Sequence, residues 1–291
     1  MGSHETDYLG QGGMIGTNFS GYHVLAKIGG GNTGIVYKAR DARSGLTVAL
    51  KILADDFLVS TEKKARFLRE TRATGILSHP AIAKLYTAGE FQGHNYLAME
   101  YVDGESFSQL IHAQPDGLAL RDFFSLMLPI LEGTAFAHQR NIAHRDLKPD
   151  NLKRTSKGQP KILDFGLVKF LDVQASSGEE SFQTFAGMVV GSAGYMSPEQ
   201  ASGNVIDERT DVFSLGIIMY ELLAGKNPFQ AKSPFSTIEK ILTATPISLE
   251  LLRPDIPLPL CNVILKCLTK NQNGRYPNGG SLLQALQSVR S

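Results

Sequence analysis

Hydrophobic and polar positions form short runs through the first hundred residues of the chain. Runs rich in β-branched and aromatic residues predict five β-strands, at 22–28, 34–39, 47–53, 83–90 and 96–101. Glycine-containing turns separate the first two strands and the last two, the latter at Gly93. A helix is predicted at 61–77, with Ser60 as its N-cap. These elements predict a small sheet accompanied by one helix.

Beyond residue 104 the pattern becomes helical. A long helix is predicted at 120–139, and Pro129 inside it should kink or locally open it, because proline removes one backbone hydrogen bond. Residues 211–224 are apolar on nearly all sides, which indicates a buried helix that ends at Gly225. The remaining elements are a hairpin of 152–154 with 161–163, an irregular stretch from 166 to 198, and helices near 237–244, 259–268 and 281–288. A β-rich part followed by a helical part predicts an α+β fold with a ligand cleft between two lobes.

Composition and charge narrow the class of protein. The 291 residues allow one large or two small domains, and the net charge of +1 gives no sign of a nucleic acid or membrane partner. No apolar run approaches the roughly 18–20 residues that span a bilayer, and we find no signal peptide. Cys261 and Cys267 lie on different faces of a predicted helix, so we expect free thiols rather than a disulfide. These features predict a soluble, cytoplasmic protein.

Residues 29–36 read G-G-G-N-T-G-I-V and fit the pattern G-x-G-x-x-G-x-V between two predicted strands. Glycines let the backbone approach phosphates closely, so that its N–H groups can face them. A strand rather than a helix follows, which argues against a dinucleotide-binding βαβ unit. Taken alone, the pattern fits a structural hairpin turn as well as a phosphate-binding loop.

Side chains suited to phosphate and metal chemistry follow in order. Lys51 lies at the end of an apolar strand, and Glu70 in the predicted helix could pair with it. Residues 144–151, H-R-D-L-K-P-D-N, place a carboxylate, a lysine and an amide on a loop stiffened by proline. Asp164 begins a D-F-G tripeptide, and its carboxylate and the amide of Asn151 are oxygen ligands of the kind that hard cations prefer. Each feature alone has an ordinary alternative as an exposed side chain or a surface turn.

The order of the motifs is more specific than any one of them. Glycine loop, lysine, glutamate, the 144–151 loop, D-F-G at 164–166 and S-P-E at 197–199 follow the order and rough spacing of the protein-kinase signature. Residues 19–288 therefore resemble the eukaryotic-like Ser/Thr protein kinases. The bacterial branch is suggested by S-H-P-A-I at 78–82, M-E-Y-V-D-G at 99–104 and Y-M-S-P-E-Q at 195–200.

The resemblance implies the bilobal protein-kinase fold, with a small β-rich N-lobe carrying one main helix, a larger helical C-lobe and an active-site cleft between them. Residues 1–18 would form a flexible N-terminal tail, which starts with a sequence that looks like an expression scar. Residues 19–290 would form the kinase domain. Its N-lobe is expected at about 19–101, its hinge at 100–104 and its C-lobe at about 105–290.

The resemblance also implies the catalytic roles. Asp146 would orient the substrate hydroxyl and accept its proton, while Lys148, typical of Ser/Thr-specific kinases, would stabilise the transferring phosphoryl group. Lys51, held by Glu70, would contact the α- and β-phosphates of ATP. The metal ligands would be Asn151 and Asp164, which would hold Mg²⁺, with Mn²⁺ as an alternative.

Contacts to the nucleotide follow from the same resemblance. They would come from Ile28, Gly29, Gly31, Gly34, Val36, Ala49, Lys51, Met99, Glu100, Val102 and Lys153. At the last of these positions the family usually has an apolar residue, which forms the floor beneath adenine. Here the methylene stem of Lys153 could lie beneath the ring with its ammonium directed outward, so an altered nucleotide affinity is expected.

The resemblance also implies two structural pairings and a regulatory switch. Glu199 would pair with Arg275, and Asp211 would brace the 144–151 loop from the buried helix. Arg145 resembles the arginine of kinases controlled by phosphorylation, and a phosphate on the activation loop, at about 167–195, could pair with it. We predict Thr184 as the main autophosphorylation site and Ser181 as the second, with a homodimer for autophosphorylation in trans; the alternative is that both are ordinary residues of a flexible loop.

Two other functions compete with an active Ser/Thr protein kinase. A pseudokinase acting as a nucleotide-binding scaffold would fit the unusual Lys153, but Lys51, Asp146 and Asp164, which pseudokinases commonly lose, are all present. A small-molecule phosphotransferase is disfavoured by Lys148 and by the long segment before S-P-E, which suits peptide docking. The predicted partners are ATP and protein substrates, with no nucleic acid and no membrane contact. Bacterial relatives often continue into a membrane span and a sensor domain, so the full-length protein could be anchored to a membrane through other segments.

Overall fold

The chain forms two compact units in this computed structural model, which describes residues 13–31, 34–54, 77–165 and 192–290. The first unit comprises the described residues up to Ser78 together with Ala83–Val102. The second comprises His79–Ile82 together with the described residues from Asp103 onward. The chain passes from one unit to the other at Val102 and Asp103, within the segment expected as the hinge.

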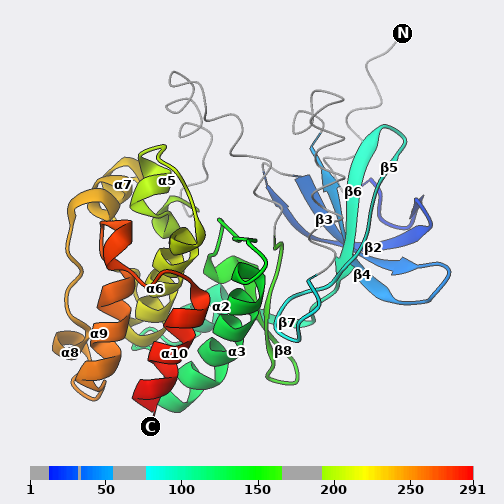
Figure 1. Cartoon of the computed structure of the whole chain (residues 1–291). Helices are drawn as coiled ribbons and strands as arrows, with labels where there is room; N and C mark the ends of the chain where they lie inside the picture. The colour runs from blue at the N-terminus through cyan, green and yellow to red at the C-terminus, as the bar shows by residue number, and fades with distance from the viewer. Residues whose placement is uncertain (1–12, 32–33, 55–76, 166–191, 291) are drawn as a thin grey trace. The chain divides into compact units, whose positions relative to one another are not determined.

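The first unit is built on a six-stranded antiparallel sheet with strand order β1-β2-β3-β4-β6-β5 (Figure 1). Its strands are β1 (Asn18–Phe19), β2 (Tyr22–Gly31), β3 (Gly34–Asp41), β4 (Thr47–Leu53), β5 (Leu85–Phe91) and β6 (His94–Glu100). All five strands predicted from the sequence are confirmed, with ends displaced by a few residues. β1 was not predicted, because two residues are too few to show a period.

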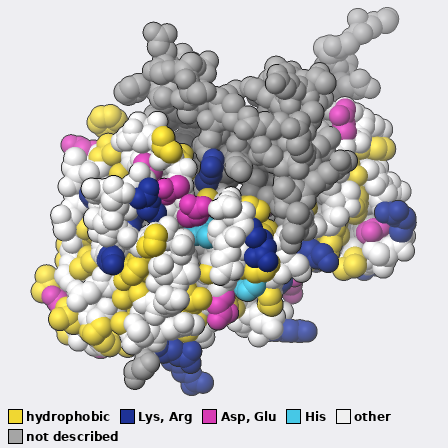
Figure 2. Space-filling view, in the orientation of Figure 1, with side chains coloured by type: hydrophobic (Ala, Val, Ile, Leu, Met, Phe, Trp, Pro, Cys, Tyr) yellow, Lys and Arg dark blue, Asp and Glu magenta, His cyan; other side chains and the backbone are white. Residues whose placement is uncertain are grey.

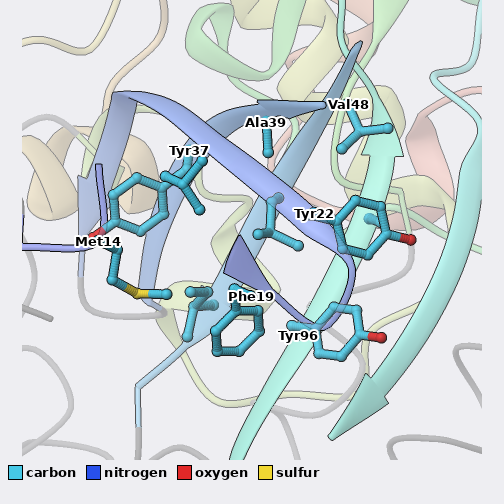
Figure 3. Close-up of a cluster of buried hydrophobic side chains, with 11 residues drawn as sticks. Met14, Phe19, Tyr22, Tyr37, Ala39, Val48 and Tyr96 are labelled. Carbon is cyan, nitrogen blue, oxygen red and sulfur yellow. The ribbon is translucent and has the colours of Figure 1, made fainter. Parts of the chain in front are cut away.

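One face of this sheet carries the hydrophobic core of the first unit (Figure 3). Phe19 contacts Phe91 and Tyr96 edge-on, with ring centroids 5.0 and 5.5 Å apart. In β4, Leu50 is fully buried in this core. Because side chains alternate along a strand, the residues on either side of Leu50 are directed to the opposite face of the sheet.

Residues 13–18 pack against the sheet, contrary to the prediction of a flexible tail over 1–18. Met14 is 9% exposed and belongs to the core of the sheet. The N–H of Gly16 donates to the carbonyl of Val24, and the N–H of Val24 donates to the carbonyl of Thr17, both at 2.9 Å. A glycine-rich polar stretch shows no period, so only these tertiary contacts reveal that it is ordered. Residues 1–12 lie outside the described part of the chain, as does the helix predicted at 61–77 except for its last residue.

The second unit is helical, with a small three-stranded sheet of order β7-β8-β9. Its helices are α2 (Phe107–Ala113), α3 (Leu120–His138), α5 (Pro198–Ala201), α6 (Glu208–Ala224), α7 (Pro234–Thr243), α8 (Leu249–Leu252), α9 (Leu258–Cys267) and α10 (Gly279–Arg290). The strands are β7 (Gly104–Ser106), β8 (Leu152–Thr155) and β9 (Pro160–Ile162), and the 3₁₀ turns are η3 (Pro149–Asn151), η6 (Ser192–Tyr195) and η7 (Gln272–Gly274). The hairpin and the helices predicted in this half are confirmed.

Helix α6 is the centre of the second unit (Figure 1). All of its side chains from Thr210 to Tyr220 are buried, as its all-round apolar sequence predicted. The carboxylate of Asp207 caps its first turn by accepting the N–H of Arg209 at 2.9 Å. Gly225 ends it in the left-handed conformation, with φ of 68°.

Helix α3 runs without interruption through Pro129, contrary to the expectation that the proline would open it locally. The residues around the proline, including Met127, Ile130 and Leu131, are fully buried. Packing on both sides of the missing hydrogen bond therefore holds the helix together where an isolated helix would open.

Residues His79–Ile82 belong to the second unit because they join the edge of its small sheet. The N–H of Ile162 donates to the carbonyl of Ala81 at 2.7 Å, and Ile82 forms a parallel bridge with Ile162. Nothing in the local sequence of this segment indicates such a partner, because the residues that it meets lie some eighty positions further along the chain.

The mixed charges on the surface and the free cysteines agree with the expectations from net charge and cysteine spacing. On the face shown in Figure 2, lysine and arginine side chains are interspersed with aspartate and glutamate. Cys261 and Cys267 are both free, as predicted, and the structure shows that both are buried. Of the helices in the described ranges, none has the length and apolar content needed to cross a bilayer.

We predict that Gly225→Ala destabilises the protein more than Gly158→Ala does. Both glycines have positive φ, 68° and 82°, so alanine at either position should cost about 1 kcal/mol in backbone strain. A Cβ at Gly225 would also lie 1.8 Å from the carbonyl oxygen of Pro115, whereas one at Gly158 would meet nothing within 4 Å. Urea denaturation should therefore show an additional loss of about 2 kcal/mol for Gly225→Ala; equal losses would contradict the role of this close approach.

Candidate active site

The backbone of the 144–151 loop is hydrogen-bonded to the carboxylate of Asp211 in α6. Its Oδ2 accepts the backbone N–H of His144 at 2.6 Å, and its Oδ1 accepts the N–H of Arg145 at 2.7 Å. Arg145 has a φ of 67°, a left-handed conformation that is costly for a residue with a side chain. The two hydrogen bonds stabilise this turn, which confirms that Asp211 braces the loop.

Asp211 is completely buried, and its environment favours the charged form. Burial by itself would raise the pKa of this carboxyl. Hydrogen bonds from the His138 ring and from the backbone at His144 outweigh burial and hold the pKa below its ordinary value. An ionised carboxylate thus serves as the acceptor at neutral pH.

His144 connects the loop to the segment that precedes Asp164. Its Nε2 donates to the carbonyl of Leu163 at 2.8 Å, and its Nδ1 accepts the backbone N–H of Asp146 at 3.2 Å. These contacts require the neutral ring with its proton on Nε2. The ring, which is fully buried, also packs edge-on against Phe165, with centroids 4.9 Å apart. The backbone of Asp146 is therefore fixed relative to the D-F-G motif.

The carboxylate of Asp146 is held on one side and accessible on the other. The Nζ of Lys148 donates to its Oδ2 at 2.9 Å. The Nδ2 of Asn151 donates both to the same oxygen, at 3.1 Å, and to the Asp146 carbonyl, at 2.8 Å. The Asp146 side chain remains 38% exposed. The structure thus brings together three of the residues that the sequence singled out in this loop.

Asn151 and Asp164 lie at the same end of the β8–β9 hairpin. The N–H of Leu163 donates to the carbonyl of Asn151 at 2.8 Å, and Leu152 pairs with Ile162. Since the Asn151 Nδ2 is directed to Asp146, its Oδ1 is the atom that the amide can offer to a metal. Among the described residues, no three His, Cys, Asp or Glu side chains gather into a metal-binding group. One carboxylate and one amide oxygen do fit Mg²⁺, which commonly takes few protein ligands and completes its shell with phosphates and water.

In the first unit, four of the predicted site residues share one face of the sheet. Val36 pairs with Lys51, and Ala49 pairs with Met99 across neighbouring strands. Directly opposed residues of antiparallel strands lie on the same face, and Ala49 and Lys51 are two positions apart in β4. This face is the one opposite the hydrophobic core, and Lys51 on it is only 7% exposed.

In the glycine-rich segment, the end of β2 lies beside the start of β3, and Gly31 pairs with Gly34. Only Gly34 is required by close packing: its φ is 131°, and a Cβ there would lie 2.0 Å from the carbonyl oxygen of Ile52. A Cβ at Gly29 would be in ordinary contact with Val36, and one at Gly31 would meet nothing within 4 Å. Ile28 precedes the loop and is 45% exposed.

The remaining predicted nucleotide contacts are divided between the two units. Met99 and Val102 are buried at the end of the first unit, and the N–H of Glu100 donates to the carbonyl of Lys84 at 2.7 Å. In the second unit, Lys153 lies on β8, where it pairs with Ser106 on one side and Lys161 on the other. Glu70, Thr184 and Ser181 lie outside the described residues.

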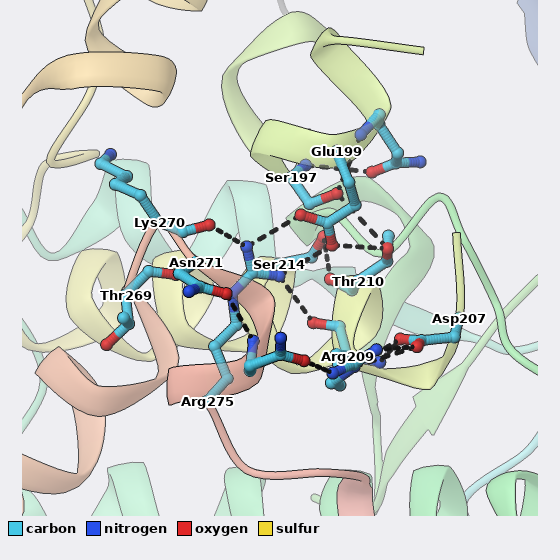
Figure 4. A network of polar contacts seen from close by, with 12 residues as sticks. Ser197, Glu199, Asp207, Arg209, Thr210, Ser214, Thr269, Lys270, Asn271 and Arg275 are labelled. Carbon is cyan, nitrogen blue, oxygen red and sulfur yellow. Dashed lines mark hydrogen bonds and ion pairs between the residues drawn. The ribbon is translucent and has the colours of Figure 1, made fainter. Parts of the chain in front are cut away.

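Glu199 and Arg275 form the predicted pair, buried in the second unit (Figure 4). The two guanidinium NH groups donate to the two carboxylate oxygens at 2.7 and 2.8 Å. Thr210 donates to the same carboxylate at 2.8 Å, and the Nε of Arg275 donates to the carbonyl of Thr269 at 2.7 Å. Burial would raise the pKa of Glu199, but the hydrogen bonds and charge of Arg275 outweigh it and lower the pKa.

The segment 195–200 is fastened to both α6 and the 144–151 loop. The hydroxyl of Tyr195 donates to Glu221 at 2.7 Å, and burial raises the pKa of that carboxyl to about 7. The Nε2 of Gln200 donates to the carbonyl of Arg145 at 2.7 Å, while its Oε1 accepts the N–H of Ser197. The contact of Gln200 with this loop was not predicted, although S-P-E-Q has the form of a capping box, which predicts a helix start.

His138 was also missed, because a histidine near the end of a predicted helix carries no distinguishing local signal. It is buried, and its ring lies 2.9 Å from the carboxylate of Asp211.

Comparison with known proteins shows the family of the chain. Residues 22–288 match the family model of the protein kinase domain. The chain is 36% identical over 279 residues to a probable serine/threonine-protein kinase of Clostridium acetobutylicum, covering 96% of this chain and 41% of that protein. It is 36% identical over 264 residues to the serine/threonine-protein kinase PrkC of Bacillus subtilis, covering 90% of this chain and 40% of PrkC. The chain thus spans about two fifths of the length of these curated relatives.

A solved structure shares the fold. The crystal structure of the Mycobacterium tuberculosis PknI kinase domain superposes with a TM-score of 0.72 at 27% sequence identity. The match covers 94% of this chain and 97% of that chain. The arrangement of a β-rich unit and a helical unit is therefore the one expected from the sequence.

We predict that Glu199→Gln lowers the free energy of unfolding by about 3–5 kcal/mol at pH 7, because it leaves the guanidinium of Arg275 buried without its counter-charge. The folded pKa of Glu199 lies below its ordinary value of 4.5, so the pair stabilises the fold above that pH and loses this contribution as the pH falls through the folded pKa. The difference between wild type and variant should accordingly shrink below about pH 4.5. Urea titrations from pH 3 to 7 measure it, with the exposed Glu239→Gln as a control expected within about 0.5 kcal/mol of wild type. A difference that is independent of pH would contradict the assignment.

Proposed function

Because the chain belongs to the protein kinase family, in its bacterial Ser/Thr branch, we propose that it transfers the γ-phosphate of ATP to Ser and Thr hydroxyls of proteins. The observation that carries the proposal is the geometry of Asp146. Its carboxylate is partly exposed and is held by Lys148 and Asn151. The buried carboxylate of Asp211 in turn holds the loop that carries Asp146. Such fixed positioning suits phosphoryl transfer, in which orientation and charge stabilisation provide most of the catalysis.

Asp146 is proposed to orient the substrate hydroxyl and to take its proton. Both side chains that hold the carboxylate donate to Oδ2, so we assign Oδ1 to the hydroxyl. The hydroxyl oxygen attacks the γ-phosphorus, its proton passes to Asp146, and ADP leaves with the electrons of the broken bond. Lys148, already 2.9 Å from Oδ2, lies where its charge can stabilise the transferring phosphoryl group.

Nucleotide and metal binding are assigned to residues of both units. Asn151 and Asp164 would hold Mg²⁺, which neutralises phosphate charge when bound. Lys51, paired with Glu70, would bind the α- and β-phosphates. The glycine loop, which begins at Gly29, would cover the phosphates with its backbone.

Contacts to adenine are proposed for residues of the first unit. Val36, Ala49 and Met99, which share a sheet face, would enclose the base, and the backbone of Glu100 and Val102 would hydrogen-bond it. Lys153 of the second unit is also proposed as a nucleotide contact, through the methylene stem of its side chain.

Substrate specificity and regulation by phosphorylation are proposed from membership of the protein kinase family. Lys148 supports Ser/Thr rather than Tyr specificity. Arg145, in its left-handed turn, would receive a phosphate from Thr184 or Ser181, and autophosphorylation in trans would use a homodimer. We also propose that the substrates are proteins and that the chain is located in the cytoplasm. There ATP is available and the two buried thiols stay reduced.

We predict that Asp146→Asn lowers phosphate transfer by roughly 10²–10⁴-fold, since it removes the proton acceptor while preserving side-chain shape. Incubation with labelled ATP, Mg²⁺ and a generic basic protein measures transfer to the chain itself and to the added substrate. Asp116→Asn, an exposed residue of the second unit, is the matched control and should transfer like wild type. Equal labelling by Asp146→Asn and wild type would refute the mechanism.

We predict that Thr184 is the principal autophosphorylation site and Ser181 the second. Mass-spectrometric peptide mapping after incubation with Mg·ATP should find phosphate on these residues in wild type and none in Asp146→Asn. A 181–184 segment that stays unmodified while the wild type phosphorylates an added protein would exclude this switch without affecting the proposed catalysis.

A further inference from the structure

His138, the last residue of α3, joins two distant parts of the second unit through its ring. It is 6% exposed. Its Nδ1 accepts the backbone N–H of Gly279, the first residue of α10, at 3.0 Å. Its Nε2 lies 2.9 Å from the Oδ2 of Asp211. Because Nδ1 is an acceptor, the ring is neutral and its proton lies on Nε2, from which it donates to the carboxylate.

The same carboxylate holds the 144–151 loop. Oδ2 of Asp211 accepts both from the His138 ring and from the N–H of His144, and Oδ1 accepts from the N–H of Arg145. A continuous series of hydrogen bonds therefore runs from the start of α10, through His138 and Asp211, to the residue just before Asp146. Every side chain in the series is buried, so water cannot replace a partner that is lost.

The first turn of α10 packs tightly against α3 at Gly279. A Cβ at Gly279 would lie 3.0 Å from the Cγ2 of Thr134 and 3.1 Å from the backbone nitrogen of Ala135. At the next residue, Gly280, the nearest atoms would be the Oδ1 of Asn278 at 3.2 Å, which accepts the N–H of Ser281, and the Ala135 Cβ at 3.9 Å. A methyl group at Gly279 thus presses against the α3 backbone, whereas one at Gly280 does not.

We infer that His138 is a positioning residue that couples the first turn of α10 to the 144–151 loop. The Nε2–H of His138 fixes the orientation of the Asp211 carboxylate, and the Gly279 N–H fixes the ring. Displacement of the first turn of α10 would release the ring, let the carboxylate rotate and loosen the left-handed turn at Arg145. The inference concerns how Asp146 is held, and in its effect on turnover it rests on the proposed function.

Four variants test the coupling. His138→Phe keeps a planar ring but removes both hydrogen bonds, and His138→Gln retains one donor and one acceptor. Gly279→Ala displaces the first turn of α10, and Gly280→Ala is its matched control.

The first measurement does not depend on activity. Hydrogen exchange of the backbone amides of His144 and Arg145 should accelerate by roughly 10-fold in His138→Phe and Gly279→Ala, because their acceptor is no longer fixed. Exchange in Gly280→Ala should match wild type, and His138→Gln should restore part of the protection. Exchange that is unchanged in both His138→Phe and Gly279→Ala would overturn the inference, and so would acceleration spread evenly over α3 and α6, which indicates general destabilisation.

The second measurement is turnover per nucleotide-binding site, with the sites counted by nucleotide titration so that unfolded protein does not contribute. We expect kcat to fall on the order of 10-fold in His138→Phe and Gly279→Ala, with the KM for ATP unchanged. The double variant should fall little further than either single one, because both act through one series of contacts. Additive losses, or a rise in KM without a fall in kcat, would overturn the coupling. A wild type that shows no Asp146-dependent transfer would instead refute the proposed function, and the amide-exchange result would still decide the positioning role.

Discussion

The second unit depends on one buried negative charge, the carboxylate of Asp211. A carboxylate removed from water is stable only when several donors surround it, and here the donors are two backbone N–H groups and one imidazole. These come from the 144–151 loop and from the end of α3. Because the charge is fully buried, each donor must occupy its position for the fold to be stable. This electrostatic requirement positions the loop that carries Asp146.

Helix α6 provides the rigid support for this arrangement. Besides Asp211, it contributes Thr210 to the Glu199–Arg275 network and Glu221 to the hydroxyl of Tyr195. The segment 195–200 and the 144–151 loop are thereby anchored to the same helix, and the hydrogen bond from Gln200 to the Arg145 carbonyl joins them directly. A helix with no exposed face through most of its length cannot shift without disturbing the whole core. Both segments are held to a single fixed element.

Much of the fold and the site could be predicted from the sequence, because the informative patterns are local. A run rich in β-branched residues predicted the strand β4, the all-round apolar run of α6 predicted a buried helix, and the order of the motifs identified the loop with Asp146. Other features could not be predicted. Residues 13–18 show no period, and the order they acquire comes from contacts such as that of Met14 with the sheet core. Pro129 indicated a local opening that buried packing on both sides of α3 prevents.

The sequence by itself determined the chemical groups and their order along the chain: the acid at 146, the amide and acid at 151 and 164, and the lysines at 51 and 148. It also implied the two buried pairings of Asp211 and Glu199, through resemblance to a family. Only the tertiary structure decided that Gln200 contacts the loop and that His138 lies between Asp211 and Gly279. The physical reason is sequence separation. Hydrogen bonds between residues 55 to 141 positions apart leave no periodic signal, and the burial that strengthens them exists only once the chain has folded.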